Sequence, residues 1–510
     1  MKIRAIWILG SLVLFVPLIL ALDSSFSKLA FGEEGEVKTV INVEELYKEV
    51  NDPVNAGATI RLAPGIYQLS AKDSNGVNRP NGGKLRLPIG TSLEGHNEYV
   101  DFDGDRIWDP RDDNGDGFPD LDAAGREIFA DPTTASIIDA TGLMLPLNTG
   151  GFIEVFSAPN STAFQSIKNL TLLGNHTPRA GIILQAANNG VLNANVQNCT
   201  IGSLSRGVQV DARRSNNDHN SMLDVTFKGN VFFYNNLPES SFGWGIQSSV
   251  ARIDKPTTHM RLRDNRFFAN KINLQIESFG VKNGVQIIKS ENNIYEAAQL
   301  VPHGEQVSSG IIIAAVGLTA PSGAVDKSSD NLIKFISKED KIWNNEGATF
   351  NEDGLFAGGG LYLSFVRLAD GAESEFHNNE IEIELEDTTF VKFDELGAFD
   401  GDQNRAINVS EPTAMRRRDI SIVGLTEVAK ASPELTSGNK ITIEVKGAAS
   451  SLMPTPYDQA PEPFQIVDNA SGRVDITVKG SPEEFLQENT GLNLPDESLF
   501  DLKEKNRGRK

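Results

Sequence analysis

Two short sequence signals alternate along most of this chain of 510 residues. In the first, an Asn (once an Asp) stands two residues before a strand-forming residue, at Asn169, Asn198, Asn230, Asn265, Asn292, Asp340, Asn379 and Asn439. In the second, a small or polar residue opens a stretch of alternating apolar side chains, at Gly181, Gly207, Gly245, Asn273, Gly310, Gly360 and Ala406. Each second signal lies between two of the first, so one pair makes a unit that repeats about seven times.

This repeat favours a parallel β-helix. A third alternating stretch often precedes the Asn, as in LDVTFKG at 223–229 and MRLRD at 260–264. Three short strands per unit, with no helix between them, are typical of such a solenoid. Asn suits the turns because it tolerates the left-handed backbone conformation and can hydrogen-bond from coil to coil. The alternative is a β-sandwich of hairpins, but Asn-Gly hairpin turns between paired strands are scarce.

Length and charge narrow the classes of protein. A chain of 510 residues is too long for one compact core, so it holds either several domains or one elongated repeat. Aromatic residues make up only 7%, which favours short strands and turns over large helical cores. The net charge of −22 repels phosphate backbones, so we expect no nucleic-acid partner.

The start of the repeat carries a resemblance. INVEELYKEV at 41–50 predicts a helix over residues 43–50, with Asn42 as its cap and Glu45 completing a capping box. Such a helix can cover the open end of a stack of strands. Together with ATIRLAPGIYQL at 58–69 and the Asn turns, it resembles the pectin-lyase-like superfamily over residues 37–450. The resemblance implies an all-β, right-handed parallel β-helix. It implies no single activity, since that superfamily includes lyases, hydrolases, epimerases and adhesins, and none of its catalytic motifs is intact here.

An acidic stretch at 101–122 predicts calcium binding. It contains nine aspartates and repeats itself at a shift of eleven residues. Oxygen ligands at the first, third, fifth and ninth positions, with Gly117 at the sixth, resemble a thrombospondin type 3 or EF-hand-like calcium loop. The first copy has Arg106 in place of Gly, and the second has Ala123 where Glu is usual. The expected ligands are Asp112, Asn114, Asp116 and Asp120, with a poorer second set of Asp101, Asp103, Asp105 and Asp109.

The N-terminus predicts export. Lys2 and Arg4 precede a long apolar run, as in a signal peptide, but no clean small-x-small site follows Ala21. An uncleaved membrane anchor is therefore the alternative. In either case we expect a secreted, periplasmic or cell-surface protein. The expected organisation is a signal or anchor at 1–32, a cap and first coils at 33–100, a calcium insertion at 101–125, the β-helix at 126–450, and final strands with a polar tail at 451–510.

The strands of the second signal point to a functional face. Aligned on their first residues, they carry apolar side chains inward, so the intervening positions point outward. Three successive outward positions are Gln209, Gln247 and Gln275, and beside them lie Asp211, Ser249 and Glu277. Asp211 and Glu277 should lie roughly 9–10 Å apart, two strand spacings. That separation fits the upper end of the range of about 6.5–9.5 Å for the carboxyl pair of an inverting glycosidase.

Two classes of function fit this face. The first is an enzyme acting on an extracellular polysaccharide, with Gln209, Gln247, Gln275 and Trp244 contacting the sugar. A hydrolase would use Asp211 and Glu277 as base and acid, whereas a lyase would use calcium with Arg213 or Arg214. The second is a non-catalytic, calcium-stabilised surface or adhesion protein, for which the polar face serves binding or solubility alone.

Overall fold

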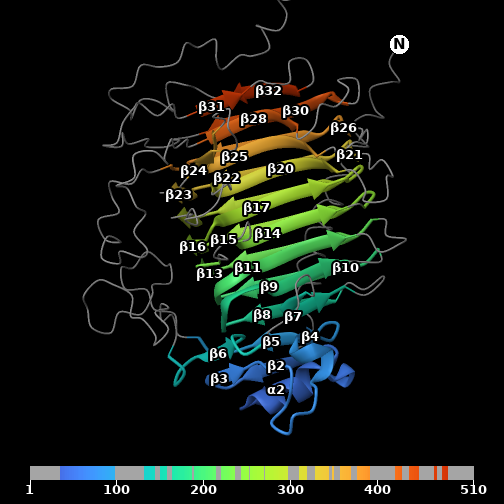
Figure 1. The fold of residues 1–510 in the computed structure, drawn as a ribbon, viewed down its shortest axis with the longest axis vertical. Helices are drawn as coiled ribbons and strands as arrows, with labels where there is room; N and C mark the ends of the chain where they lie inside the picture. The colour runs from blue at the N-terminus through green and yellow to red at the C-terminus, as the bar shows by residue number, and fades with distance from the viewer. Residues whose placement is uncertain are drawn as a thin grey trace, which may run out of the picture.

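The chain forms a right-handed parallel β-helix (Figure 1). The computed structural model describes residues 35–97, 131–143, 150–157, 163–186, 189–213, 220–235, 243–251, 253–268, 270–296, 309–318, 328–343, 347–349, 356–368, 376–390, 420–427, 436–446, 464–467 and 474–479. The coils stack along the long axis of the molecule, with the N-terminal coils at one end and β31 (Phe464–Val467) and β32 (Val474–Lys479) at the other.

One face of the stack, the long sheet, pairs parallel strands from end to end. Its register is strict, and buried side chains alternate with half-exposed or exposed ones, as in β12, β18 and β22. In order, its described strands are β1 (Val37–Val40), β2 (Thr59–Leu62), β5 (Ser92–Glu94), β8 (Phe164–Lys168), β10 (Val191–Gln197), β12 (Met222–Lys228), β15 (Thr257–Arg263), β18 (Val285–Glu291), β22 (Leu332–Lys338), β27 (Glu380–Glu386), β30 (Asn439–Lys446) and β32.

Two further faces close the coil. The site sheet pairs β4 (Leu85–Leu87), β7 (Gly151–Phe156), β9 (Thr171–Ala186), β11 (Thr200–Arg213), β14 (Trp244–Ala251), β17 (Ile272–Phe279), β20 (Ser309–Leu318), β25 (Phe356–Leu368), β28 (Ile420–Glu427) and β31. The short-strand sheet pairs β3 (Gly65–Gln68), β6 (Ser136–Asp139), the first halves of β9 and β11, β13 (Val231–Phe233), β16 (Arg266–Phe268), β19 (Ile294–Glu296) and β23 (Lys341–Trp343). Smaller pairings join β21 (Ser328–Ser329), β26 (Phe376–His377) and β29 (Thr436–Ser437), and also β24 (Gly347–Thr349) with β25.

The Asn signal combines two adjacent structural positions. The first is a residue with positive φ, as at Asn169, Asn198 and Asn292, which turns the chain between two faces. Gly229, Asp264, Asn292 and Glu339 also have positive φ, and the residue after each belongs to a ladder of side chains. In this ladder Asn230, Asn265 and Asn293 are joined, and Asp340 is the last member among the described residues. The signals at Asn379 and Asn439 belong to another ladder, which begins at Asn331 and precedes the long sheet.

In each ladder, the side chains hydrogen-bond to backbone groups as well as to one another. The Oδ1 of Asn265 accepts from the backbone N of Asn230 at 3.0 Å and from its Nδ2 at 2.9 Å. Asn293 repeats the pattern on Asn265 at 2.9 and 2.8 Å. The ladder residues are buried, and buried polar groups are tolerated only when they are hydrogen-bonded in this way. The prediction that stacked Asn side chains connect the coils is therefore confirmed.

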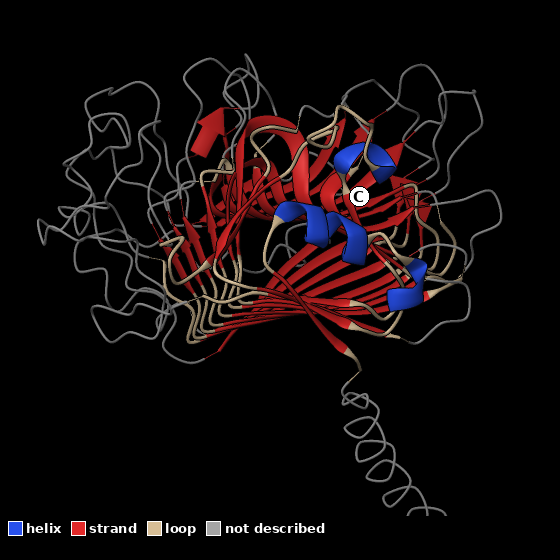
Figure 2. Ribbon diagram, turned by 90° about the horizontal axis from the view of Figure 1, so that it is seen from below, coloured by secondary structure: helices blue, strands red, loops and turns tan. Residues whose placement is uncertain are grey.

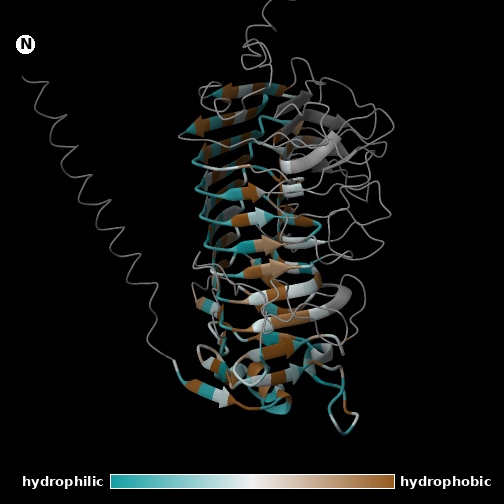
Figure 3. Cartoon of the chain, turned by 90° about the vertical axis from the view of Figure 1, so that its left-hand side faces the viewer, coloured by the Kyte–Doolittle hydropathy of each residue, from teal (hydrophilic) through white to brown (hydrophobic). Residues whose placement is uncertain are grey.

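The lumen is filled by apolar side chains from all three faces. Figure 2, seen from below, shows the strands enclosing this interior, and Figure 3 shows the alternation of apolar and polar positions along the stacked coils. Aromatic rings stack from coil to coil: Phe232 on Phe267, and Phe267 on Tyr295, each at 4.7 Å between centroids and 15° between planes. Identical coil geometry places equivalent side chains one strand spacing apart, which explains the regular stacking.

The predicted capping helix is confirmed as α2 (Val43–Val50). The Asn42 side chain accepts from Glu45 N at 2.9 Å, and the Glu45 carboxylate accepts from Ile41 N at 2.9 Å. Leu46, Tyr47 and Val50 are buried against the first coil. The short 3₁₀ segments Pro53–Asn55 and Pro80–Gly83 lie at the same end of the stack.

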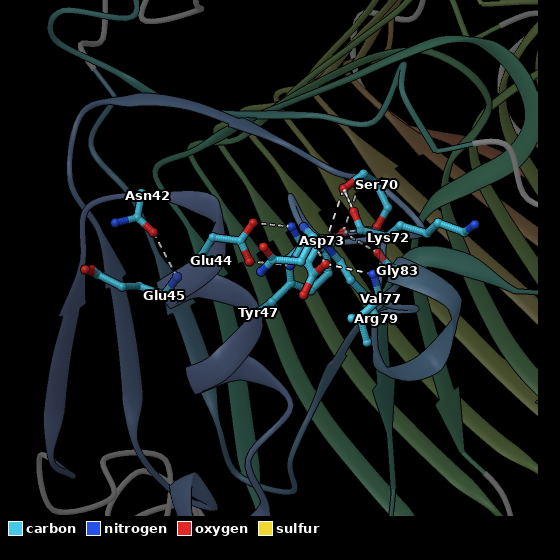
Figure 4. A network of polar contacts seen from close by, with 11 residues as sticks. Asn42, Glu44, Glu45, Tyr47, Ser70, Lys72, Asp73, Val77, Arg79 and Gly83 are labelled. Atoms are coloured by element: carbon cyan, nitrogen blue, oxygen red, sulfur yellow. Dashed lines mark hydrogen bonds and ion pairs between the residues drawn. The ribbon is translucent and has the colours of Figure 1, made fainter.

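A polar network ties the cap to the first coils (Figure 4). The guanidinium of Arg79 donates to both oxygens of Glu44, at 2.8 and 2.5 Å, and lies 4.1 Å from the centre of the Tyr47 ring. The hydrogen bond from Arg79 lowers the pKa of Glu44. The Tyr47 hydroxyl donates to the carbonyl of Gly83 at 2.7 Å. These contacts hold the loop at 70–83 against the helix that closes the stack.

One expected strand position is wrong. The sequence predicts that the second signal at Ala406 supplies the strand that follows β25 on the site sheet. The strand that pairs with β25 is β28, whose Ser421 lies opposite Tyr362. Residues 406–410 lie outside the described part of the chain. The error arises because ISIVGLTE at 420–427 has the same alternation but lacks a small opening residue.

Candidate functional site

The site sheet brings the predicted polar residues into register. Gln209 of β11 lies opposite Gln247 of β14, which lies opposite Gln275 of β17. Two residues further along the same strands, Asp211, Ser249 and Glu277 form a second row. The apolar residues Ile183 and Ile312 flank the first row on β9 and β20. Together these two rows on β11, β14 and β17 form one polar patch, which we call the polar row.

A third row lies at the start of the same strands. Arg206 pairs with Trp244, and Trp244 pairs with Ile272. The Arg206 guanidinium lies 4.8 Å from the centre of the Trp244 ring, and its Nε donates to Oε1 of Gln247 at 2.6 Å. The indole Nε1 of Trp244 donates to Oε1 of Gln275. Arg206 and Trp244 of this third row therefore hydrogen-bond to two of the three glutamine amides, those of Gln247 and Gln275.

The polar row is largely buried, although sequence periodicity predicted an outward face that contacts glycan or solvent. Asp211 is 3% exposed, Glu277 is 7% exposed, and the three glutamines are 5–9% exposed. Trp244, Ile272, Ile312 and Tyr362 form an apolar cluster separate from the lumen, each at most 6% exposed. Side chains on the outer side of this sheet are thus packed together, as those in the lumen are. Because Trp244 has so little accessible surface, its evident contribution is to hold Gln275 rather than to offer a ring for sugar stacking.

Glu277 has the most strongly altered chemistry of the row. Burial raises its pKa to about 8, against the opposing effects of the Gln247 hydrogen bond and the charge of Arg206. Its carboxyl group is therefore mainly protonated at neutral pH. Gln247 donates from Nε2 to Oε2 of Glu277 at 3.4 Å. A buried carboxylic acid that keeps its proton near pH 7 has the property required of a general acid.

Asp211 stands in the same row as Glu277, with one strand between them. It accepts from the Nε2 of Gln209 at 3.3 Å within its own strand. Two strand spacings of about 4.8 Å separate the two backbone positions. Each of the two carboxyl groups thus receives a glutamine N–H, and the two face the same side of the sheet.

Several predicted site residues lie wholly or partly beyond what the structure describes. Arg213 ends β11 opposite Ala251, but its side chain lies outside the described atoms, and Arg214 lies outside the described residues. The acidic stretch 101–122 also lies outside them, including Asp101, Asp103, Asp105, Asp109, Asp112, Asn114, Asp116 and Asp120. Within the described ranges, no group of three or more His, Cys, Asp or Glu side chains could hold a metal ion. This finding does not bear on the acidic stretch.

The structure adds Arg206 to the site and shows two further buried charged residues on or beside the site sheet, Lys271 and Glu154. Arg206 contacts the polar row directly. Lys271, just before β17, is 3% exposed, and burial lowers its pKa to about 8. Glu154 of β7 lies opposite Ile183, is 2% exposed, and pairs with Lys84 at 2.6 Å and Arg86 at 2.7 Å. The alternation in GFIEVF at 151–156 could have indicated Glu154, which lies two strands from Gln209 in the same register. No sequence pattern distinguishes Lys271.

Comparisons with known proteins identify no family. No family model matches the chain, and no curated protein sequence matches it. The A-module of a mannuronan C-5 epimerase from Azotobacter vinelandii is similar at 13% identity, covering 86% of this chain and 100% of that one, with a TM-score of 0.29. A DFA-IIIase from Arthrobacter chlorophenolicus A6 is similar at 13% identity over 87% and 90%, with a TM-score of 0.37. The catalytic domain of a GH87 α-1,3-glucanase is similar at 10% identity over 88% and 69%, with a TM-score of 0.27. At these TM-scores the similarities support no argument about activity. The fold and the site define the class of this protein as a parallel β-helix with a buried polar row.

Proposed function

We propose that this chain is an exported protein that binds an extracellular polysaccharide at the polar row and cleaves it there. One observation carries the proposal: Glu277, a buried carboxyl whose pKa is raised to about 8, shares a row with Asp211 on the same face of the sheet. Burying two carboxyl groups outside a hydrophobic lumen is costly and gives the fold nothing that apolar residues would not give. Strongly perturbed acids in such surroundings are typical of functional sites.

The chemistry would be hydrolysis with inversion. Glu277 donates its proton to the glycosidic oxygen as the bond to the leaving sugar breaks, and Asp211 accepts a proton from the attacking water. The separation of two strand spacings leaves room for that water between the carboxylate and the sugar. Gln209, Gln247 and Gln275 supply amide groups at strand spacing, which suits successive hydroxyl groups of a polymer.

Two elements of the proposal concern residues outside the described ranges. Residues 1–32 would direct export or anchor the protein, with a secreted, periplasmic or cell-surface destination. None of the described helices is both long enough and apolar enough to cross a membrane. Calcium would bind at Asp112, Asn114, Asp116 and Asp120, and at a weaker site formed by Asp101, Asp103, Asp105 and Asp109. A lyase reaction assisted by calcium and by Arg213 or Arg214 is the second catalytic route.

A non-catalytic glycan-binding or adhesion protein is the alternative function. It is favoured by the internal hydrogen bonding of the row, since Gln247 already contacts Arg206 and Glu277, and Gln275 already contacts Trp244. Such a network can be a rigid structural element that binds sugar without cleaving it. This alternative predicts binding without product.

A product screen separates these functions. The purified protein is incubated with a panel of neutral and acidic polysaccharides, and reducing ends and unsaturated products are measured separately. Hydrolysis predicts new reducing ends without unsaturation, whereas a lyase predicts unsaturated products. Binding to at least one polysaccharide with neither product would support the adhesion protein, and neither binding nor product on any of them would contradict the proposal.

A further inference from the structure

The orientation of two glutamine amides in the polar row is set by groups that can only donate hydrogen bonds. An arginine guanidinium and a tryptophan indole N–H have no acceptor atom. Arg206 therefore requires the oxygen of Gln247 to face it, as the 2.6 Å contact shows. Trp244 requires the same of Gln275. The ambiguity between oxygen and nitrogen that usually attends an amide side chain is thus removed by its neighbours.

This orientation has a consequence for Glu277. With its oxygen held by Arg206, Gln247 must turn its NH₂ group away, and this group contacts Oε2 of Glu277 at 3.4 Å. An oxygen that accepts from an amide N–H is a poor place for the acidic proton. The proton of the neutral acid is therefore directed to Oε1.

We propose that Arg206 is a positioning residue that acts through Gln247 to fix which oxygen of Glu277 carries its proton. The inference deepens the proposed function and rests on it for the role of Glu277 as an acid. If Arg206 were absent, the Gln247 amide could rotate by half a turn and present its oxygen to Glu277. That oxygen would accept the acidic O–H, stabilise the protonated form, and remove the proton from reach of a substrate.

Among the residues that the structure describes, few other charged groups lie near the Glu277 carboxyl. In the row of Glu277, the neighbouring strands β14 and β20 present Ser249 and Ala314, neither of which titrates. Asp211 of β11 lies one strand further away, and Lys271 precedes β17. From the long sheet, the Nε2 of Gln286 donates to the backbone carbonyl of Glu277, at 3.1 Å. The charge of Arg206 also acts on Glu277 directly, and the hydrogen bonds that connect the two side chains run through Gln247.

The test is an infrared titration of Glu277 in the full-length protein without substrate. The C=O band of its protonated carboxyl is identified by its loss in Glu277→Gln. Arg206→Met should raise the titration midpoint by roughly one pH unit, the size expected when the Gln247 amide no longer donates to the Glu277 carboxyl. Gln247→Met, which keeps Arg206, should raise the midpoint similarly. Arg261→Gln removes an equal charge from the half-exposed Asp224 pair on the long sheet and should leave it unchanged.

A double variant distinguishes the relay from a direct charge effect. If Arg206 acts through Gln247, adding Arg206→Met to Gln247→Met should raise the midpoint little further, because the two changes remove one interaction. Additive shifts, or an unchanged midpoint in Arg206→Met, would overturn the inference. Should Arg206→Met fail to fold by circular dichroism, Gln247→Met alone decides, since an unchanged midpoint there excludes the relay. Because the titration needs no substrate, a chain that cleaves no glycan yet shows these shifts contradicts only the proposed function.

Discussion

Asp340 accepts hydrogen bonds from both the backbone N and the Nδ2 of Asn293, at 2.7 and 3.0 Å. A carboxyl group thus occupies the final position of a ladder whose preceding members are asparagines. The hydroxyl of Ser337 donates to its other oxygen at 2.6 Å. Burial raises the pKa of Asp340 to about 6, against the effect of these donors.

This relationship predicts a pH-dependent stability difference for Asp340→Asn. Because the pKa of Asp340 in the folded state, about 6, lies above its ordinary value of 3.8, the favourable contribution of the protonated group is present below pH 3.8 and is lost as the pH rises through 6. Asn does not ionise, so the variant keeps its stability as the pH rises. It should be more stable than the parent at pH 8 by roughly 2 kcal/mol. Urea denaturation at pH 4, 6 and 8 measures the difference. A difference that does not grow between pH 4 and 8 would count against this assignment.

Asn265 should be a stability determinant of the stack. Replacing it by Ala leaves the Asn230 amide groups and the Phe227 carbonyl without their partner, at a cost of about 3 kcal/mol. Asn195→Ala on the outer surface of the long sheet is the matched control, because its side chain contacts only Gln197, at 3.3 Å, among the contacts the structure describes. The urea midpoint should fall clearly in the first variant and little in the second. Equal effects would show that the ladder does not stabilise the coils.

Calcium should raise the thermal stability of the protein. Binding to the native state alone raises the free energy of unfolding with the logarithm of free calcium above the dissociation constant. Melting temperatures are compared in chelator and in millimolar calcium, for the parent and for Asp112→Ala with Asp116→Ala. The calcium response should be strongly reduced in the double variant, because only the weaker site formed by Asp101, Asp103, Asp105 and Asp109 remains. An equal melting temperature with and without calcium in the parent would refute the prediction.

Turnover should decline on the alkaline side as Glu277 loses its proton. Its pKa of about 8 predicts a fall in kcat/KM above that pH, because a general acid must be protonated to act. The profile is recorded on the polysaccharide found in the product screen. A rate that stays constant to pH 10 would exclude Glu277 as the acid.

Gln247 should contribute to glycan affinity whether or not the protein is catalytic. Gln247→Ala removes the amide between Arg206 and Glu277 and should weaken binding about tenfold, the loss of one hydrogen bond to a charged group. Isothermal titration with the bound glycan provides the affinity. Unchanged affinity would place the glycan elsewhere on the surface.

Periodicity predicted the backbone better than the environment of the site. Alternation alone placed Gln209, Gln247 and Gln275 in register, because a parallel stack repeats each coil at constant offset. The capping helix followed from Asn42 and Glu45, which are local signals. The burial of the row was not predictable, since alternation says which face a side chain occupies and not what covers that face. The role of Arg206 depends on a contact with another strand, 41 residues away in sequence.

The most direct test of the proposed function is the turnover of Glu277→Gln and Asp211→Asn beside their thermal stability at pH 7. Glutamine has nearly the shape of the neutral acid, so Glu277→Gln should fold with an unchanged or slightly higher melting temperature. Both variants are expected to lose reducing-end production by at least about a hundredfold, the lower range for a general acid or base. Parental turnover in either stable variant would contradict the account.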